Sequence, residues 1–178
     1  MSTIINHKNK FIFIHVPKTG GTMIKEILVD KFGCDGWIGG HHPISTINNP
    51  HSYFTFGCVR NPYTRMQSAY KEIRGKQNHK CGTFEEFCIN PPTQFPHIKT
   101  QYYWLNKKGN LVDKIIKTEE LSTEFPKLLK KFNFDATIEI PIIRKGTTEF
   151  DVTLTDKCKK AIVDRYKIDF EKFNYEIK

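Results

Sequence analysis

The chain has 178 residues, of which 38% are hydrophobic and 26% are charged, so one globular domain over residues 1–178 is expected. These proportions exclude a disordered chain, and no stretch approaches the roughly 20 apolar residues that a transmembrane helix needs. The formal net charge of +9 favours anionic partners, although solubility alone also accounts for it.

The beginning of the chain and the cysteines bear on the compartment. Residues 1–10 lack the apolar core of a signal peptide, so we expect a cytoplasmic, soluble protein without a membrane span. Five cysteines without a CxxC pair argue against a zinc site and against a complete disulfide framework. We therefore expect no bound metal and free thiols.

The sequence FIFIHVPKTGGT, residues 11–22, combines a strand, a glycine loop and the start of a helix. The apolar run from Phe11 to Val16 predicts a buried strand, and Gly20 and Gly21 follow a proline. Backbone N–H groups at glycines approach an oxyanion closely, and a helix N-terminus adds partial positive charge. Because Lys18 contributes a full charge, the segment predicts an anion-binding loop; an ordinary strand-to-helix turn is the alternative.

A helix is predicted to follow from about Thr22 to Phe32, with Gly33 as its C′ residue. The loop differs from a Walker A sequence, GxxxxGK[ST], because Lys18 precedes the glycines instead of following them. A nucleotide kinase or NTPase with a related loop is nevertheless one alternative function.

Residues 34–51, CDGWIGGHHPISTINNPH, are predicted to form a loop or a short helix because of their glycine, proline and asparagine content. His41 and His42 are adjacent in this segment. An imidazole can take a proton from a hydroxyl group near neutral pH, so both are candidate general bases. Polar loop residues without chemistry are the alternative.

A second apolar run, residues 53–60, predicts another strand that ends in Arg60. Asn61 and Pro62 are typical of the N-cap and first position of a helix, and Ser68 follows two turns later. Open α/β sheets bind ligands at the carboxyl ends of their strands, so Arg60 is a candidate ligand for an anion. A salt bridge at the strand end is the alternative.

The two motifs PKTGGT and VRNPYTRMQSAY occur in the order found in sulfotransferases, which the chain resembles from residue 11 to residue 175. HVPKTGGT is most similar to the carbohydrate branch, sulfotransferase family 2, which includes heparan sulfate 2-O-sulfotransferases. The resemblance implies an α/β fold: a single P-loop-like domain with a short parallel sheet flanked by helices.

The resemblance also implies an activity and a role for each motif residue. The expected reaction transfers a sulfuryl group from 3′-phosphoadenosine 5′-phosphosulfate (PAPS) to a hydroxyl of a carbohydrate or glycan acceptor, anionic acceptors included. The products are the sulfated acceptor and adenosine 3′,5′-bisphosphate, and no metal is required. Lys18 is expected to neutralise charge on the leaving group, and the 5′-phosphate is expected to be bound by Lys18, Thr19, Gly20, Gly21 and Thr22. Arg60 and Ser68 are expected to bind the 3′-phosphate. His42 is expected to remove the proton of the acceptor, with His41 as the runner-up.

A further basic segment lies near the C-terminus. Arg144, Lys145 and Gly146 resemble the RKG sequence of cytosolic sulfotransferases, whose arginine and glycine backbone touch the 3′-phosphate. A solvated turn is the alternative, because the rest of that longer motif is not matched.

Several other residues have expected roles. Arg65 is interpreted as a buried ion partner, and Gln101 as a candidate acceptor contact because of the resemblance. Lys71, Arg74 and Lys76 form a candidate basic rim. N-caps are predicted at Thr83, in a capping box with Glu86, and at Ser122 and Thr155.

A second alternative function is a non-catalytic module that binds polyanions through its net charge. Recognition of nucleic acid is not expected. The sequence indicates neither the identity of the acceptor nor an oligomeric state.

Overall fold

The computed structural model describes residues 2–34, 36–76, 79–134 and 150–178. The chain divides into two compact units, which we call the sheet unit (residues 1–59 and 103–144) and the helical unit (residues 60–102 and 145–178). Each unit has its own cluster of buried apolar side chains. That the two together constitute one domain stays a prediction.

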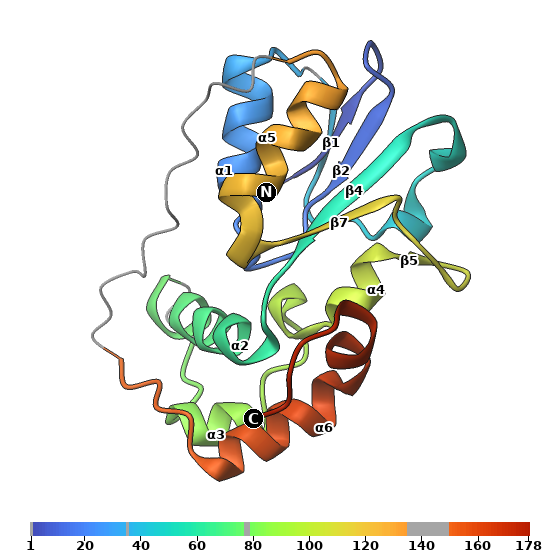
Figure 1. Ribbon diagram of the computed structural model, residues 1–178. Helices are drawn as coiled ribbons and strands as arrows, with labels where there is room; N and C mark the ends of the chain where they lie inside the picture. The colour runs from blue at the N-terminus through green and yellow to red at the C-terminus, as the bar shows by residue number, and fades with distance from the viewer. Residues whose placement is uncertain (1, 35, 77–78, 135–149) are drawn as a thin grey trace. The chain divides into compact units, whose positions relative to one another are not determined.

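The sheet unit contains a five-stranded sheet with the order β3-β1-β2-β4-β7 (Figure 1). The strands are β1 (Ser2–Asn6), β2 (Phe11–Ile14), β3 (Gly36–Gly39), β4 (Phe54–Val59) and β7 (Lys114–Lys117). β2, β4 and β7 are parallel, whereas β1 runs antiparallel to both β2 and β3. The predicted α/β class is therefore confirmed, and the parallel strands are extended by an antiparallel pair into a mixed sheet.

The sequence patterns did not predict β1 and β3. β3 has the sequence GWIG and lies within the segment that was predicted to be a loop or a short helix. It pairs with β1 in a register that matches Ile4 with Trp37, far away along the chain. Such a short, glycine-containing strand is stabilised mainly by its ladder of hydrogen bonds, which local propensity does not reveal.

Two helices cover one face of the sheet, as Figure 1 shows: α1 (Gly21–Glu26) with its π-helical extension η1 (Ile27–Lys31), and α5 (Leu121–Lys131). Their apolar side chains join those of the strands in one core, which includes Phe11, Phe13, Ile24, Leu28, Phe56, Phe125 and Leu129. The predicted helix after the glycine loop is confirmed, although its second half is π-helical. Gly33 has the positive φ of 60° that a C′ residue adopts, as predicted.

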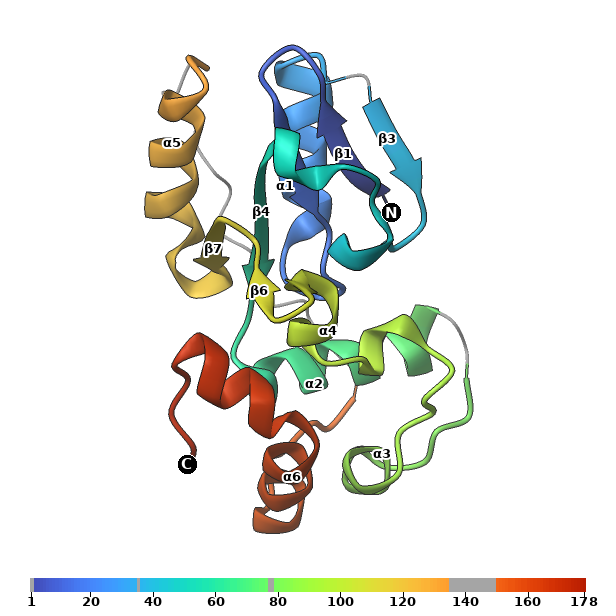
Figure 2. The same cartoon turned by 90° about the vertical axis from the view of Figure 1, so that its right-hand side faces the viewer.

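Leu105, the last residue of α4 (Gln101–Leu105), packs against β4. A Cβ atom at Gly57 would overlap a methyl group of Leu105, so this strand position requires glycine. The chain continues through the small hairpin β5 (Asn106–Lys107) and β6 (Asn110–Leu111) before it enters β7 (Figure 2). Two short 3₁₀ turns, η2 (Ile44–Thr46) and η3 (Pro50–Ser52), lie between β3 and β4.

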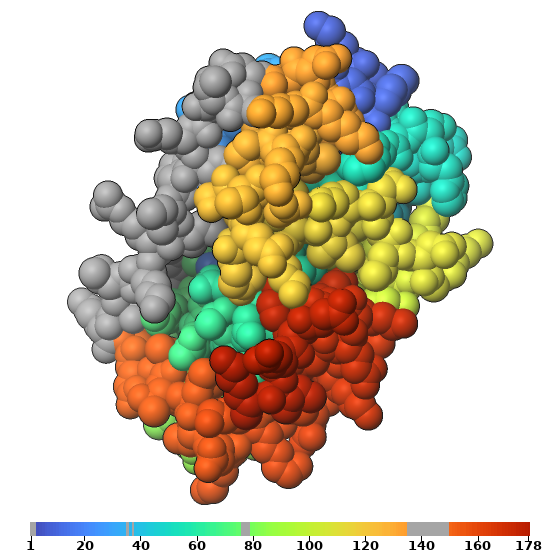
Figure 3. All heavy atoms as spheres, viewed as in Figure 1, coloured from blue at the N-terminus to red at the C-terminus, as the bar shows by residue number. Residues whose placement is uncertain are grey.

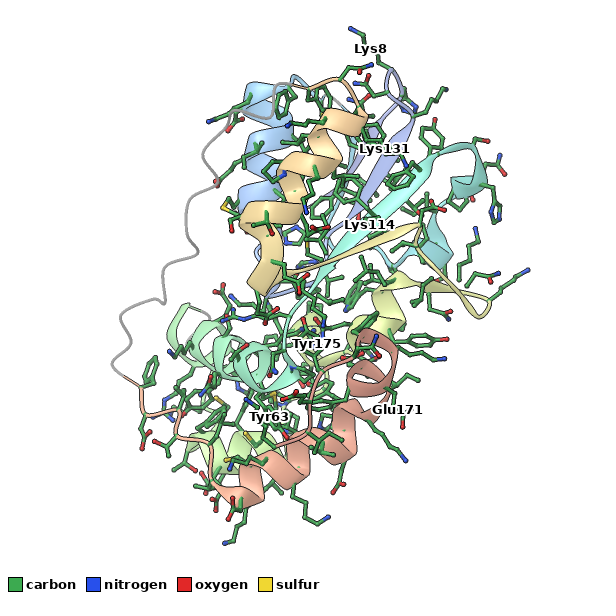
Figure 4. All side chains as sticks on the ribbon, viewed as in Figure 1. Lys8, Tyr63, Lys114, Lys131, Glu171 and Tyr175 are labelled. Atoms are coloured by element: carbon green, nitrogen blue, oxygen red, sulfur yellow. The ribbon has the colours of Figure 1, made fainter. Side chains whose placement is uncertain are left out.

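The predicted N-cap at Ser122 is wrong. A 3₁₀ turn, η6 (Thr118–Glu120), runs directly into α5, so Glu120 takes the cap position and Ser122 lies inside the helix. The outer side of α5 is exposed in the space-filling view (Figure 3). At its end the ammonium group of Lys131 lies 3.6 Å from the centroid of the Phe54 ring, a cation–π contact (Figure 4).

The helical unit consists of α2 (Pro62–Lys71), α3 (Phe84–Ile89) and α6 (Asp156–Phe173), with the π-helical η4 (Glu72–Lys76) and the 3₁₀ turn η5 (Pro96–Ile98). Its core joins Tyr63, Met66, Tyr70, Phe84, Phe87, Ile162, Tyr166 and Phe170. The N-caps predicted at Asn61, Thr83 and Thr155 are confirmed, each side chain accepting a hydrogen bond from a first-turn N–H.

Within the described part of the chain, no helix is both long and apolar enough to cross a membrane. The five cysteines are thiols, and four of them are buried.

Candidate functional site

The loop between β2 and α1 is a tight turn in the sheet unit. Lys18 and Gly20 both have positive φ values, 68° and 81°. A positive φ is uncommon for lysine, so the loop holds this residue in a conformation that the surrounding contacts must maintain. Thr19 is fully buried, and its hydroxyl donates a hydrogen bond of 2.9 Å to the carbonyl oxygen of Val16. The turn is therefore closed by its own side chain.

Thr118 joins this loop to β4. Its hydroxyl oxygen lies 2.9 Å from the carbonyl oxygens of both Thr19 and Val59, so one hydroxyl proton is shared between the loop and the last residue of β4. No sequence motif contains Thr118. It directly follows β7, at the carboxyl end of a parallel strand, where open α/β sheets place functional residues.

His15 packs against Gly21, where the loop ends and α1 begins. Its side chain is 1% exposed and stacks on Phe13, with ring centroids 5.9 Å apart. A Cβ atom at Gly21 would overlap the imidazole, so Gly21 is needed because the helix begins directly against this ring. Burial, and secondly the nearby His41, lowers the pKa of His15 to about 3. His15 is therefore a neutral packing residue, which the sequence analysis did not anticipate.

The two candidate bases have different surroundings. Nδ1 of His41 lies 3.1 Å from the carbonyl oxygen of His15, and its ring packs against the rings of His15 and Trp104. Nε2 of His42 lies 2.6 Å from the carbonyl oxygen of Gly39, within its own turn. Since a carbonyl oxygen only accepts, the neutral ring carries its lone pair on Nε2 in His41 and on Nδ1 in His42. His41 thus packs against His15, directly before the loop, whereas the hydrogen bond of the His42 ring lies within its own turn.

The second motif begins where the helical unit starts, because Arg60 directly follows Val59 in the chain. The Nε–H of Arg60 donates a hydrogen bond of 3.1 Å to the hydroxyl of Thr64. Thr64 and Ser68 are four residues apart in α2, so they lie on the same face of the helix, and both are half-buried. Arg60, just before α2, and Thr64 and Ser68 within it therefore form a polar row.

Two neighbouring residues have structural roles. Arg65 is 2% exposed, and its guanidinium donates to the carbonyl oxygens of His97 and Lys99, at 3.1 and 2.9 Å. Burial lowers the pKa of Arg65, and Tyr166 and then Asp169 oppose this effect; that Arg65 is an ion partner stays a prediction. Gln101 was expected to contact an acceptor, but its side chain is fully buried and bonded to the backbone of Arg60.

The remaining predicted residues are placed in part. Arg74 of the proposed rim donates a hydrogen bond of 2.9 Å to the hydroxyl of Tyr70, so part of its bonding capacity is used inside the helical unit. Arg144, Lys145 and Gly146 lie outside the described residues. Among the described residues, no group of three His, Cys, Asp or Glu side chains is arranged to hold a metal ion.

The comparisons with known proteins give one match. Residues 1–176 match a family model described as Sulfotransferase family, which covers the sheet unit and the helical unit alike. Neither a curated protein nor a solved structure matches the chain significantly.

Proposed function

The chain belongs to the sulfotransferase family, and we propose that it transfers the sulfuryl group of PAPS to a hydroxyl of a carbohydrate or glycan acceptor. Sulfuryl transfer in general follows from the family. The donor, the class of acceptor and the roles of individual residues are our proposal.

One observation carries the proposal: both motif segments leave parallel neighbouring strands at the same edge of the sheet. β2 and β4 pair in parallel with Ile14 opposite Gly57. The PKTGGT loop follows β2, and Arg60 follows β4 directly. Carboxyl ends of parallel strands are where open α/β sheets bind nucleotides, which supports a nucleotide-binding role for each motif.

The residues of the loop fit a phosphosulfate group. The Lys18 ammonium would neutralise the charge that develops on the leaving 5′-phosphate when the bond between the sulfur and the bridging oxygen of PAPS breaks. The backbone and hydroxyl groups of Thr19, Gly20, Gly21 and Thr22 hold the 5′-phosphate. Arg60 binds the 3′-phosphate through its planar guanidinium, with Ser68 one helical turn beyond Thr64. This second phosphate distinguishes PAPS from ATP.

We assign proton removal to His42, with His41 as the alternative. The hydrogen bond from Nε2 to the Gly39 carbonyl leaves the lone pair of a neutral His42 on Nδ1, the nitrogen that would take the hydroxyl proton as the new S–O bond forms. In a neutral His41 the lone pair is on Nε2, which is buried, so an acceptor hydroxyl does not reach it in this conformation.

The choice of a carbohydrate acceptor rests on the resemblance of HVPKTGGT to the carbohydrate branch and on the net charge of +9. A basic protein attracts acidic glycans from a distance and raises their local concentration. Acidic oligosaccharides are therefore the first acceptors to test, beside neutral ones.

The nucleotide site is tested by calorimetric titration of adenosine 3′,5′-bisphosphate, ADP and AMP against the wild-type chain. We expect selective binding of the bisphosphate. Arg60→Ala should weaken it by about 10- to 150-fold, because a hydrogen bond to a charged group contributes about 1.5–3 kcal/mol. Lys172→Ala, which removes an exposed charge at the end of α6, is the matched control and should leave binding unchanged.

Equal binding of ADP and the bisphosphate would contradict the proposed donor and favour a nucleotide kinase. Salt-sensitive binding of all polyanions alike would favour a charge-driven binding module. If the bisphosphate binds selectively, product formation from PAPS with a panel of glycans then compares His41→Ala with His42→Ala. Loss of turnover in His41→Ala alone would overturn the assignment of His42.

A further inference from the structure

The backbone of Arg60 is held by one buried side chain. The N–H of Arg60 donates a hydrogen bond of 2.7 Å to Oε1 of Gln101, and Nε2 of Gln101 donates one of 2.9 Å to the carbonyl oxygen of Arg60. Gln101 is 0% exposed. Both polar ends of its amide therefore bind the donor and the acceptor of a single peptide residue, which fixes the position and orientation of the backbone at Arg60.

Gln101 is itself held by a buried carboxylate. Oδ2 of Asp169 accepts a hydrogen bond of 2.8 Å from the N–H of Gln101, and Oδ1 accepts one of 2.9 Å from the N–H of Tyr102. Asp169 lies in α6 and is 0% exposed. Its burial raises the pKa of the carboxyl group, and the buried guanidinium of Arg65 and the two N–H bonds reduce this effect.

This arrangement serves a residue between two regular elements. Arg60 follows the end of β4 and precedes α2, so its N–H and carbonyl belong to neither ladder. The Nε–H of its side chain bonds the hydroxyl of Thr64, the next residue of the polar row. The path Asp169–Gln101–Arg60 therefore runs from the core of the helical unit to the first residue of that row.

We propose that Gln101 and Asp169 are positioning residues that set the guanidinium of Arg60 for recognition of the 3′-phosphate. The inference rests on the proposed function, since it assumes that Arg60 binds this phosphate. Gln101 acts on the nucleotide through Arg60, and it contacts neither an acceptor nor the reacting atoms.

The test compares the dissociation constants of adenosine 3′,5′-bisphosphate and AMP, which differ by the 3′-phosphate, in wild type and in Gln101→Met. Methionine keeps the length and volume of the side chain and removes both hydrogen bonds to Arg60. We expect the preference for the bisphosphate to fall about tenfold with AMP binding unchanged. A general loss of packing would weaken both nucleotides alike and leave the preference intact.

Gln67→Met is the matched control, because the Gln67 amide also bonds a backbone carbonyl in the helical unit, that of Val152, at 2.8 Å. It should keep the wild-type preference. Gln101→Glu is the second variant should Gln101→Met fail to fold: its carboxylate still accepts from the Arg60 N–H but cannot donate to the carbonyl, so the preference should fall as well.

Arg60→Ala separates this inference from the proposed function. If Arg60→Ala leaves the preference unchanged, the proposed nucleotide site is wrong. If Arg60→Ala abolishes the preference while both Gln101 variants retain it, the nucleotide site stands and the positioning role is wrong. If the nucleotide site and the positioning role are both correct, adding Gln101→Met to Arg60→Ala should not lower the preference for the bisphosphate further, because the two residues act through one contact.

Discussion

Replacing Gly21 by alanine tests how the loop is supported. The added methyl group would overlap the imidazole of His15, which cannot easily move because it is stacked on Phe13 and packed against His41. Forcing a methyl group into such a site costs about 1–3 kcal/mol of unfolding free energy. We expect Gly21→Ala to lose this amount in urea denaturation, and to bind adenosine 3′,5′-bisphosphate more weakly because α1 begins at this residue, directly after the loop.

The size of the effect can be assigned to the ring by a double-mutant cycle. In His15→Ala the imidazole is absent, so the Gly21→Ala methyl group should cost less than about 0.5 kcal/mol in that background, a coupling of about 0.5–3 kcal/mol. Gly39→Ala is the control, because Gly39 is exposed and a Cβ atom there has no neighbour within 4 Å. Equal costs for Gly21→Ala with and without His15, or a cost as small as that of Gly39→Ala, would refute the proposed contact.

Two further predictions concern the same unit. Because the pKa of His15 falls from 6.5 to about 3 on folding, the unfolded chain takes up a proton below pH 6.5 that the folded chain does not. The unfolding free energy should therefore fall as the pH is lowered from 6.5 toward 3, by up to about 1.4 kcal/mol per pH unit. His15→Asn should flatten this dependence on pH. Equal slopes for the wild type and His15→Asn would contradict the prediction. Thr118→Val removes the hydroxyl shared by the Thr19 and Val59 carbonyls and should lower the free energy of unfolding in urea by about 1 kcal/mol. Thr123→Val is the control: it loses an exposed hydrogen bond to the Glu120 carbonyl and should change the free energy of unfolding by less than about 0.5 kcal/mol.

These variants separate support of the loop from chemistry. His15, Gly21 and Thr118 hold the backbone on which Lys18 and Thr19 are displayed, and their loss is expected to appear first in stability. Arg60, Lys18 and the histidine pair are expected to affect binding or turnover with little effect on unfolding. A measurement of both quantities for each variant therefore distinguishes the two groups.

Elements whose formation depends on neighbouring residues could be predicted from the sequence. The strand before the loop, the following helix with Gly33 at its end, and the capped helices that start at Pro62, Phe84 and Asp156 were all predicted. Each depends on nearby residues: alternation or runs of apolar side chains, a glycine with positive φ, or a polar cap. The two motifs and their order were visible for the same reason, because each is contiguous in the chain.

The tertiary structure alone decided what depends on residues that are distant in the sequence. β1 and β3 form because each finds a partner to complete its hydrogen bonds, although neither has a strong strand pattern. Gln101 looked like a polar contact for an acceptor until its amide was found on the Arg60 backbone. Likewise His15 and Thr118 carry no motif, and their roles arise from burial and from carbonyl oxygens brought together by folding. Structure that depends on neighbouring residues can therefore be predicted from a single sequence. The burial and hydrogen-bond partners of polar side chains depend on tertiary packing and are seen only in the folded chain.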